Sequence, residues 1–436
     1  MDAIAKMPTY EAYKDSGVEW LGEVPAHWEM SNLKRVVKEH SGNGFSIELQ
    51  GQAGDVPFLK VSDLSCADVF VSTAANKVTH NMIRKQRWNI VPAGSLVTAK
   101  IGEALRKNHR KLLSQDSIID NNCIAFECVD IQVKFNFYLH LVLDFDWFVN
   151  PGAVPSISVK KYKAEVVALP TEQEQTLIAN FLDQKTAQID EAIAIKEQQI
   201  ALLKERKQII IQKAVTQGLD LDVPMKDSGV DWIGEIPAHW DVVRFKNLFR
   251  QSRLPVREGD GVVTSYRDGQ VTLRSNRRLD GYTEAIIEGG YQGIRIGQLV
   301  LNSMDAFEGA IGVSESDGKC TPEYVICDPT RDDVNQYYFS YLLREMALAK
   351  YIQVICNAVR QRAVRIRFNN LAHRFMVLPS EAEQQAIVEF IESQKRRTDS
   401  AVDQLNDQIS KLKEYKTTLI NSAVTGKIRI TPEMVA

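Results

Sequence analysis

The sequence predicts an α/β protein in which two mixed α/β domains are separated by two long, antiparallel coiled-coil helices. Three observations support this fold class: a Trp-rich motif that occurs twice, a helix-opening motif that occurs twice, and an apolar stripe of heptad spacing after each helix opening. Together they make the chain a tandem repeat with pseudo-two-fold symmetry. Its 436 residues exceed one typical domain, so roughly two to four units are expected.

Duplicated motifs define the repeat. Lys14–Trp28 reads KDSGVEWLGEVPAHW and Lys226–Trp240 reads KDSGVDWIGEIPAHW, so three positions differ, all conservatively. LPTEQEQ at Leu169–Gln175 returns as LPSEAEQ at Leu378–Gln384. A helical stretch follows each of these motifs. The first ends with AVTQG at Ala214–Gly218, and the second ends with AVTG at Ala423–Gly426. A period this long indicates a duplicated domain pair and not a solenoid.

Between these motifs the two globular blocks have diverged. Residues 41–165 do not align by eye with residues 253–375. Both blocks contain short β-branched or aromatic segments broken by Gly, Asp and Pro, such as Val56–Val61 and Gln298–Asn302, which predict strands. Similar framing around dissimilar contents indicates one scaffold that presents two different recognition surfaces.

Each long helix has a clear start signal. Thr171 and Ser380 follow a proline and are predicted N-caps, and Glu174 and Glu383 lie three residues further on, which completes a capping box. A glycine then ends each helix.

Alternating steps of four and three residues select an apolar stripe along each helix. We predict a coiled-coil seam of Leu182, Ile189, Ile193, Ile200, Leu203 and Ile210 in the first helix and of Ile391, Val402, Leu405, Ile409, Leu412 and Leu419 in the second. Packing the two helices against each other, antiparallel, would bury both stripes. Pairing between two chains is the alternative, but two stripes of equal length and phase in one chain favour the intramolecular pair.

Composition and charge exclude several classes of protein. The 53 basic and 56 acidic side chains give a net charge of -3, which argues against a polycationic nucleic-acid coat but leaves room for local basic faces. Mean hydropathy is -0.22, no apolar run approaches the roughly 20 residues of a membrane span, and the N-terminus lacks a signal-peptide pattern. We therefore expect a cytoplasmic protein that does not bind a membrane.

The residues usually found at metal and catalytic sites lack the required spacing. The six cysteines form no C-x-x-C pair and the seven histidines supply no partner, so we expect no metal site and buried, reduced thiols. Gly312–Cys320 resembles a phosphate-binding loop, but five residues instead of four separate its glycines, and Cys320 replaces the Ser/Thr that would hold Mg²⁺. We interpret it as a turn. Motifs of dinucleotide binding, serine hydrolases, zinc proteases, amino-methyltransferases and nucleases are missing, so we predict no catalytic residue.

Basic clusters are the remaining candidate sites. A looser basic region in the second block includes Arg250, Arg253 and Arg257, and arginines in Arg360–Arg367 alternate in a way that could place them on one face of a strand. The DNA-binding candidates are Lys100, Arg106, Lys107, Arg110, Lys111, Arg267, Arg274, Arg277, Arg278, Arg360, Arg362, Arg365 and Arg367.

These clusters favour nucleic acid as the ligand. The planar fork of arginine suits guanine edges and phosphates, and basic clusters in both blocks indicate double-stranded DNA contacted by two domains. A solvated charged face is the alternative for any single cluster. The repeated tryptophans (Trp20, Trp28, Trp232 and Trp240) stand beside Gly and Pro, so we assign them to packing and not to base stacking.

The repeated motifs resemble the specificity subunit of type I restriction–modification systems. W-[LI]-G-E-[VI]-P-A-H-W opens each block, L-P-x-E-x-E-Q opens each helix and A-V-T-x-G closes it, in an order that covers nearly the whole chain. The resemblance implies target-recognition domains at 1–167 and 226–376 and conserved helical regions, the spacer helices, at 168–217 and 377–426. A linker at 218–225 and a C-terminal tail at 427–436 complete the chain.

The resemblance also implies a non-catalytic subunit of a DNA adenine methyltransferase and restriction complex. Each recognition domain would read one half of a split, asymmetric target, while the helices set the gap and dock two methyltransferase subunits that carry S-adenosylmethionine. Two restriction/translocase subunits, which use ATP and Mg²⁺, can join them. No base contact is transferred, because the recognition domains of the family vary freely. The alternative function is a coiled-coil scaffold that joins two protein-interaction domains and does not bind DNA.

Overall fold

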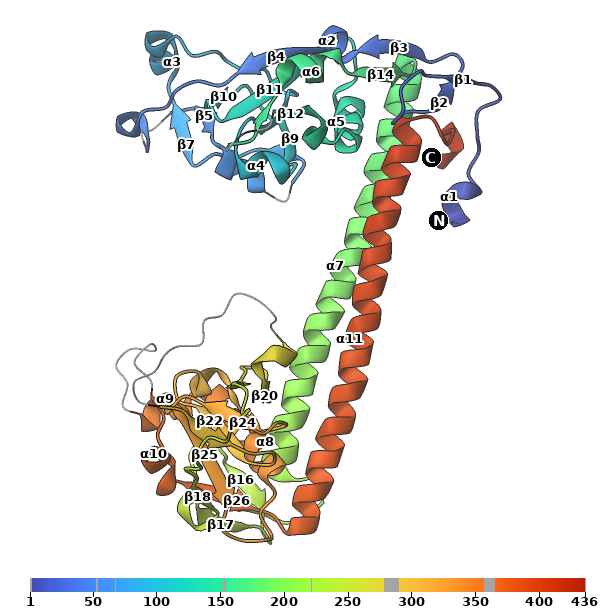
Figure 1. The fold of residues 1–436 in the computed structure, drawn as a ribbon. Coiled ribbons are helices and arrows are strands. Elements are labelled where there is room, and N and C mark those ends of the chain that lie inside the picture. Colours follow the sequence, from blue (N-terminus) through green and yellow to red (C-terminus); the bar gives the residue numbers. More distant parts are fainter. Residues whose placement is uncertain are drawn as a thin grey trace. The chain divides into compact units, whose positions relative to one another are not determined.

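The computed structural model describes residues 2–51, 54–66, 68–150, 152, 154–220, 222–277, 290–356 and 365–435. They form two compact units: unit 1 comprises Met1–Lys196 and Asn406–Ala436, and unit 2 comprises Glu197–Leu405. The long helices α7 (Glu172–Gln217) and α11 (Glu381–Val424) each contribute to both units (Figure 1). Each unit therefore contains one globular block and a segment of both helices.

The block of unit 1 is built from short strands and helices. Its helices are α1 (Asp2–Ala5), α2 (Leu33–Val36), α3 (His80–Gln86), α4 (Glu103–Arg106), α5 (Val133–Val142) and α6 (Val159–Ala164). Its strands are β1 (Tyr13–Asp15), β2 (Glu23–Pro25), β3 (Glu29–Asn32), β4 (Val37–Ser41), β5 (Val56–Leu59), β6 (Phe70–Val71), β7 (Asn76–Val78), β8 (Leu96–Ala99), β9 (Arg110–Leu113), β10 (Ile118–Ile119), β11 (Cys123–Cys128), β12 (Val149–Asn150), β13 (Ser156–Ile157) and β14 (Val166–Leu169).

The block of unit 2 has a similar mixture. Its helices are α8 (Gln336–Leu348), α9 (Tyr351–Ile355) and α10 (Phe368–Ala372). Its strands are β15 (Met225–Asp227), β16 (Glu235–Pro237), β17 (Asp241–Arg244), β18 (Phe249–Gln251), β19 (Val263–Ser265), β20 (Val271–Leu273), β21 (Gln292–Ile294), β22 (Leu299–Asn302), β23 (Ile311–Val313), β24 (Gly318–Cys320), β25 (Tyr324–Pro329) and β26 (Phe375–Leu378). The Gly312–Cys320 stretch ends β23, turns and begins β24.

Although their sequences do not align, the two blocks share one sheet order. It is β4-β11-β8-β9 in unit 1, where β6 extends it, and β18-β25-β22-β23 in unit 2. Every one of these pairings is antiparallel except that of β6 with β9. The framing strands repeat as well, because β1–β2 corresponds to β15–β16 and β3–β14 to β17–β26. The predicted mixed α/β class is confirmed.

The conserved start of each long helix is a capping box. In unit 1, the Thr171 backbone N–H donates to Glu174 Oε2 (3.2 Å), and the Glu174 N–H donates to Thr171 Oγ1 (3.4 Å). In unit 2, the pair Ser380 and Glu383 makes the same two bonds, at 3.1 and 3.4 Å. Each box satisfies backbone N–H groups that a helix start leaves without an intrahelical partner.

The same glutamates anchor the Trp-rich motif to the helix. His239 Nε2 lies 2.7 Å from Glu383 Oε1, and Trp240 Nε1 donates to that oxygen at 3.1 Å. Burial alone would raise the pKa of Glu383, but the hydrogen bonds from His239, Ser380 and Trp240 outweigh it and lower the pKa to about 2. Trp240 is 1% exposed, which agrees with the packing role assigned to it.

The last residue of the helix-opening motif joins each helix to its block. Gln384 is fully buried, and its Nε2 donates to the carbonyls of Pro379 and Asp333, both at 2.9 Å. Its Oε1 accepts a hydrogen bond from the backbone N–H of Asn335, immediately before α8, at 2.8 Å. Gln175 repeats two of these bonds in unit 1. The seven-residue motif therefore supplies both the helix cap and a buried glutamine that joins the helix to its block, which we call the joint.

In unit 1, side-chain pairs show that the two long helices run antiparallel. Lys416 Nζ lies 2.7 Å from Asp190 Oδ1, and Lys196 Nζ donates to Gln408 Oε1 at 2.6 Å. Residue numbers on α11 therefore fall as those on α7 rise. The predicted antiparallel, intramolecular arrangement is confirmed in this unit.

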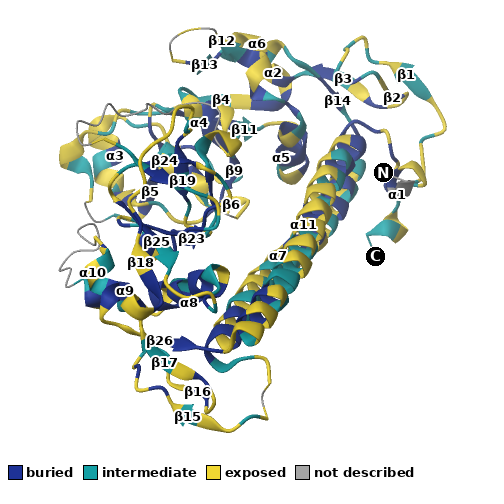
Figure 2. Ribbon diagram, turned by 60° about the horizontal axis from the view of Figure 1, so that its bottom comes forward, coloured by how far each residue is buried: buried dark blue, intermediate teal, exposed yellow. Residues whose placement is uncertain are grey.

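Unit 2 repeats the ion pair, with Lys207 Nζ 2.7 Å from Asp399 Oδ1. Along both helices the predicted stripe has reduced exposure, while the outer faces are exposed (Figure 2). The buried stripe positions are Leu182, Ile189, Ile193, Ile391, Ile409 and Leu419, and the partly buried ones are Ile200, Leu203, Ile210, Val402, Leu405 and Leu412.

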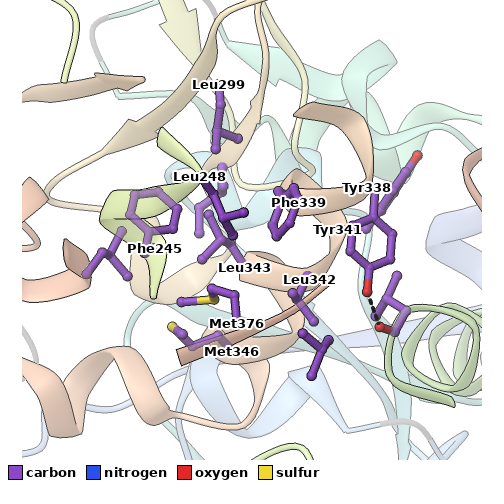
Figure 3. Close-up of a cluster of buried hydrophobic side chains, with 14 of the residues drawn as sticks. Phe245, Leu248, Leu299, Tyr338, Phe339, Tyr341, Leu342, Leu343, Met346 and Met376 are labelled. Atoms are coloured by element: carbon purple, nitrogen blue, oxygen red, sulfur yellow. Dashed lines mark hydrogen bonds between the residues drawn. The ribbon is translucent and has the colours of Figure 1, made fainter. Parts of the chain in front are cut away.

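In unit 2 a single apolar cluster joins the sheet, α8 and the adjacent helix ends. It includes Phe245, Leu299, Phe339, Leu342 and Met376, all fully buried (Figure 3). Residues of α7 and α11 belong to the same cluster. Within unit 2, this cluster therefore fixes the block on its helix segments.

Gly426 ends α11 where no side chain fits. Its φ is +73°, and a Cβ atom would lie 2.3 Å from Pro25 Cδ. We expect Gly426→Ala to lower the free energy of unfolding by about 2 kcal/mol or more, because a left-handed alanine costs roughly 1–2 kcal/mol before the overlap is counted. Denaturant unfolding of the full chain measures it. Gly17→Ala is the matched control, with φ +69° and no atom within 4 Å of the new Cβ. An equal loss in both variants would contradict the steric explanation.

Candidate functional site

The predicted basic cluster of the first block divides into surface and interior residues. Lys100 is half-buried, and Arg106 and Lys107 are exposed at the C-terminal end of the short helix α4. Arg106 Nη1 lies 3.4 Å from Glu103 Oε1, an exposed pair that contributes little to stability. These three remain candidates for DNA contact.

Arg110 and Lys111 are corrected, because both side chains are used inside the domain. Arg110 is 7% exposed, donates from Nη2 to the carbonyl of Leu143, and lies 4.3 Å over the Phe145 ring. Burial lowers the pKa of its guanidinium to about 10, against the opposing effect of the Asp144 charge. Lys111 is 9% exposed, and its Nζ donates to two backbone carbonyls at 2.6 and 2.7 Å. Both side chains therefore stabilise the fold through hydrogen bonds to internal carbonyls, and they do not contribute to a basic surface.

Three candidate arginines of the second block have side-chain partners within the block, and two of these arginines pair with acids. Arg267 pairs with Asp305 (3.0 Å) and with Glu308. Arg277 pairs with Asp268 (2.7 Å) and lies over the ring of Tyr266. The Arg274 Nε donates to Thr264 Oγ1 at 3.2 Å. Arg278, Arg360 and Arg362 lie outside the described residues.

The remaining two candidates, Arg365 and Arg367, line a cavity of about 330 Å³ in unit 2. They flank Ile366, which is fully buried, so both arginines point away from the core. The sequence alternation predicted this shared face, although the segment is extended and is not part of a strand. The cavity brings them together with Arg253, a member of the looser basic region.

Other polar side chains of the cavity come from distant segments. Its lining is Gln251, Arg253, Ser303, Pro322, Glu323, Tyr324, Val325, Arg365, Arg367, Phe368 and Asn369. Ser303, Tyr324 and Val325 are buried and form the floor, whereas the arginines, amides and Glu323 are exposed and form the rim. We refer to this site as the rim pocket. Gln251, Glu323 and Asn369 were not predicted from the sequence, because no local pattern links them to the arginines.

Hydrogen bonds to one buried serine hold two walls of the rim pocket. Ser303, directly after β22, donates from Oγ to the carbonyl of Ile366 at 2.7 Å, and its backbone N–H donates to the carbonyl of Glu323 at 3.0 Å. The Ile366 N–H returns a bond to the Ser303 carbonyl at 3.2 Å. The backbone that carries Arg367 and the backbone that carries Glu323 are therefore fixed relative to each other.

The third wall is held in the same way. Ser252 lies between Gln251 and Arg253; its backbone N–H donates to the carbonyl of Ile326 at 2.8 Å, and its Oγ accepts a bond from Gln298 Nε2 at 3.0 Å. Exposed side chains of the rim thus alternate with buried, hydrogen-bonded residues. This arrangement presents polar groups to a ligand from a fixed backbone.

Two rim arginines and the rim carboxylate have no ion-pair partner among the described residues. Among the described residues, neither Arg253 nor Arg367 has a carboxylate within 4 Å, and Glu323 has no basic partner within that distance. The arginines can donate planar forks of N–H groups, while Glu323 can only accept when ionised. The site thus combines hydrogen-bond donors and an acceptor, which suits a ligand that presents both acceptor and donor groups.

Three further features of the described residues concern metal binding, membrane insertion and free thiols. Within them, no group of three or more His, Cys, Asp or Glu side chains is placed to hold a metal ion. No helix found among them is long and apolar enough to cross a membrane. The six cysteines are free; Cys123, Cys320 and Cys327 are buried, and the other three are partly exposed, so the expectation of uniform burial is wrong.

Part of the chain is similar to a known protein family. Residues 25–205 match the family model described as the type I restriction modification DNA specificity domain. This part of the chain is therefore similar to that DNA specificity domain. The match covers most of the first block and most of the first long helix, and the duplicated motifs repeat its framing in the second half. The resemblance to type I specificity subunits predicted from the motifs is confirmed.

Individual relatives of the specificity domain agree. The chain is 22% identical over 344 residues to the type I restriction enzyme EcoBI specificity subunit of Escherichia coli, covering 72% of this chain and 70% of that protein. It is 25% identical over 230 residues to the MjaVIII specificity subunit of Methanocaldococcus jannaschii, covering 52% and 50%.

Two solved structures share the fold of the specificity subunit. The HsdS subunit from Thermoanaerobacter tengcongensis has a TM-score of 0.54 at 14% identity, covering 93% of this chain and 98% of that one. A chain from a structure on complex assembly and conformational transition of the type I R-M system has a TM-score of 0.66 at 13% identity, covering 92% and 98%. The shared fold extends over both halves of the chain.

Proposed function

We propose that this chain is the DNA-binding specificity subunit of a type I restriction–modification complex and reads a bipartite, asymmetric target. The observation that carries the proposal is the repeat. The same frame, including its capping boxes and helix–helix ion pairs, occurs twice and holds two blocks that share a sheet order but whose sequences do not align. In a DNA-binding dimer, the geometry of the dimer sets the spacing between two identical half-sites. A duplicated frame that holds two different domains could in the same way set the spacing between two different half-sites.

In this proposal the chain binds and positions but performs no chemical step. Methylation of adenine belongs to two methyltransferase subunits that bind S-adenosylmethionine, and two restriction/translocase subunits supply ATP- and Mg²⁺-dependent cleavage when present. The long helices space the two blocks and present exposed outer faces to the methyltransferase subunits. The net charge of -3 fits a subunit whose partners share the phosphate contacts.

The test is to map methylated adenine across DNA from cells that express this chain with its methyltransferase partner. We expect a split motif with methyladenine in both halves, and its disappearance when the chain is deleted. If an active methyltransferase with the folded chain produced no motif, the chain would be the alternative coiled-coil scaffold. The outcome depends on sequence preference and not merely on DNA affinity, so non-specific binding cannot imitate it.

A further inference from the structure

The rim pocket of unit 2 has a donor and acceptor pattern that matches one kind of base pair. In the major groove, guanine shows two acceptors, N7 and O6, and its cytosine partner shows the N4 amino group as a donor. Arginine forks pair with the guanine acceptors, and a carboxylate accepts from the cytosine amino group. Arg253, Arg367 and Glu323 supply both functions around one cavity.

The carboxylate argues against a phosphate clamp. Glu323 is exposed on the same rim as the arginines, where its negative charge would repel a phosphate group. It is also not tied to either arginine by an ion pair within 4 Å among the described residues. Glu323 can therefore accept a hydrogen bond from a ligand, and Arg253 and Arg367 can donate hydrogen bonds to it. This combination suits a ligand that has a donor group next to acceptor groups.

The backbone anchoring gives this pattern a fixed geometry. Ser303 ties the segments that carry Arg367 and Glu323 to the end of β22, and Ser252 ties the segment that carries Arg253 to β25. Discrimination between bases requires that the reading groups keep their spacing, whereas phosphate contacts tolerate more freedom. The rim pocket meets that requirement, because both serines hold its walls through hydrogen bonds.

We propose that the rim pocket reads a G·C base pair in the half-site bound by unit 2, with Arg253 and Arg367 donating to guanine and Glu323 accepting from cytosine. The proposal rests on the proposed function, since it assigns base identity within a target that the whole subunit recognises. It concerns one base pair of one half-site and leaves the half-site read by unit 1 unaffected.

The experiment uses the full chain in complex with its methyltransferase partner. Once the wild-type motif is mapped, methylation rates are measured on duplexes in which each base pair of the motif is replaced in turn. We expect Arg367→Lys, Arg253→Lys and Glu323→Gln to lose discrimination at one G·C pair of one half-site, and to keep it elsewhere. A bidentate contact discriminates roughly five- to 150-fold, so the loss is measurable.

Arg250→Lys is the matched control, because Arg250 is exposed on β18 beside the pocket but does not line it. It should leave every base preference unchanged. If the three pocket variants slowed methylation equally on all duplexes, with a weaker salt dependence, the arginines would be phosphate contacts and the proposal would be wrong. The proposal would also be wrong if the three variants kept every base preference of the wild type. That would hold even if they lost binding to an acidic protein partner. A wild-type complex without sequence preference would instead overturn the proposed function.

Discussion

Replacing Gln384 by leucine is expected to destabilise unit 2 by roughly 3–5 kcal/mol. Leucine nearly fills the volume but removes three hydrogen bonds, leaving the carbonyls of Pro379 and Asp333 and the N–H of Asn335 without partners. Each buried group left without a partner costs about 1–3 kcal/mol. Since Gln384 is fully buried, water cannot replace the lost amide. Denaturant unfolding of the full chain, compared with wild type, measures the loss.

Two variants make this result interpretable. Gln385→Leu changes the neighbouring, exposed glutamine and should alter stability by less than about 0.5 kcal/mol. Gln175→Leu removes the equivalent side chain of unit 1, which bonds the Pro170 carbonyl (3.0 Å) and the Gln132 N–H (2.9 Å), so a smaller loss than for Gln384 is expected. If Gln384→Leu and Gln385→Leu had equal effects, the buried joint would not be the source of stability.

This joint shows which parts of the fold local sequence can predict. The capping boxes at Thr171 and Ser380 were predicted, because both partners lie within four residues. The role of Gln384 was not, because its partners include Asp333 and Asn335, which are distant in sequence. The antiparallel helix pair was predictable for a similar reason: heptad spacing is a local property, and the duplication indicated the partner.

The globular blocks required information that local patterns lack. Their shared sheet order depends on pairings such as β4 with β11 and β18 with β25, which join segments far apart in the chain. Residues 41–165 and 253–375 show no common pattern by eye, so the common topology could not be read from either sequence. Different side chains satisfy the same backbone pairing, and this permits the surface to change while the scaffold remains.

The candidate site shows the limits of reasoning from charge. Arg110 and Lys111 belonged to a dense basic cluster, yet β9 turns both side chains toward internal carbonyls. For Arg365 and Arg367, the alternation with Ile366 predicted a common exposed face, and the structure agrees. No sequence pattern singled out Glu323, because it is of interest only through lining the same cavity as arginines from two other segments. Charge alone finds candidates, whereas burial and partners decide among them.

The largest functional effect is expected from lengthening both helices together. We would insert one heptad between Lys196 and Glu197 in α7 and one between Leu405 and Asn406 in α11, the positions where the two units divide. Seven residues keep the apolar stripe in phase and add about 10 Å at 1.5 Å per residue. If the helices space the recognition domains as proposed, the preferred gap should lengthen by about three base pairs at 3.4 Å each. Methylation mapping of the variant complex reads the new gap directly.

Insertion in only one helix is the matched control for the spacing argument. Each unit keeps its own helix pairing, marked by Lys416–Asp190 in unit 1 and Lys207–Asp399 in unit 2, so one longer helix cannot satisfy both pairings without a bulge. We expect the single insertions to destabilise the seam and abolish methylation of any split motif, whereas the matched insertion preserves methylation at a longer gap. An unchanged gap in a folded, active double insertion would show that something other than helix length sets the spacing. Because the half-site sequences should remain the same in that variant, the experiment separates the spacing of the target from the reading of its bases.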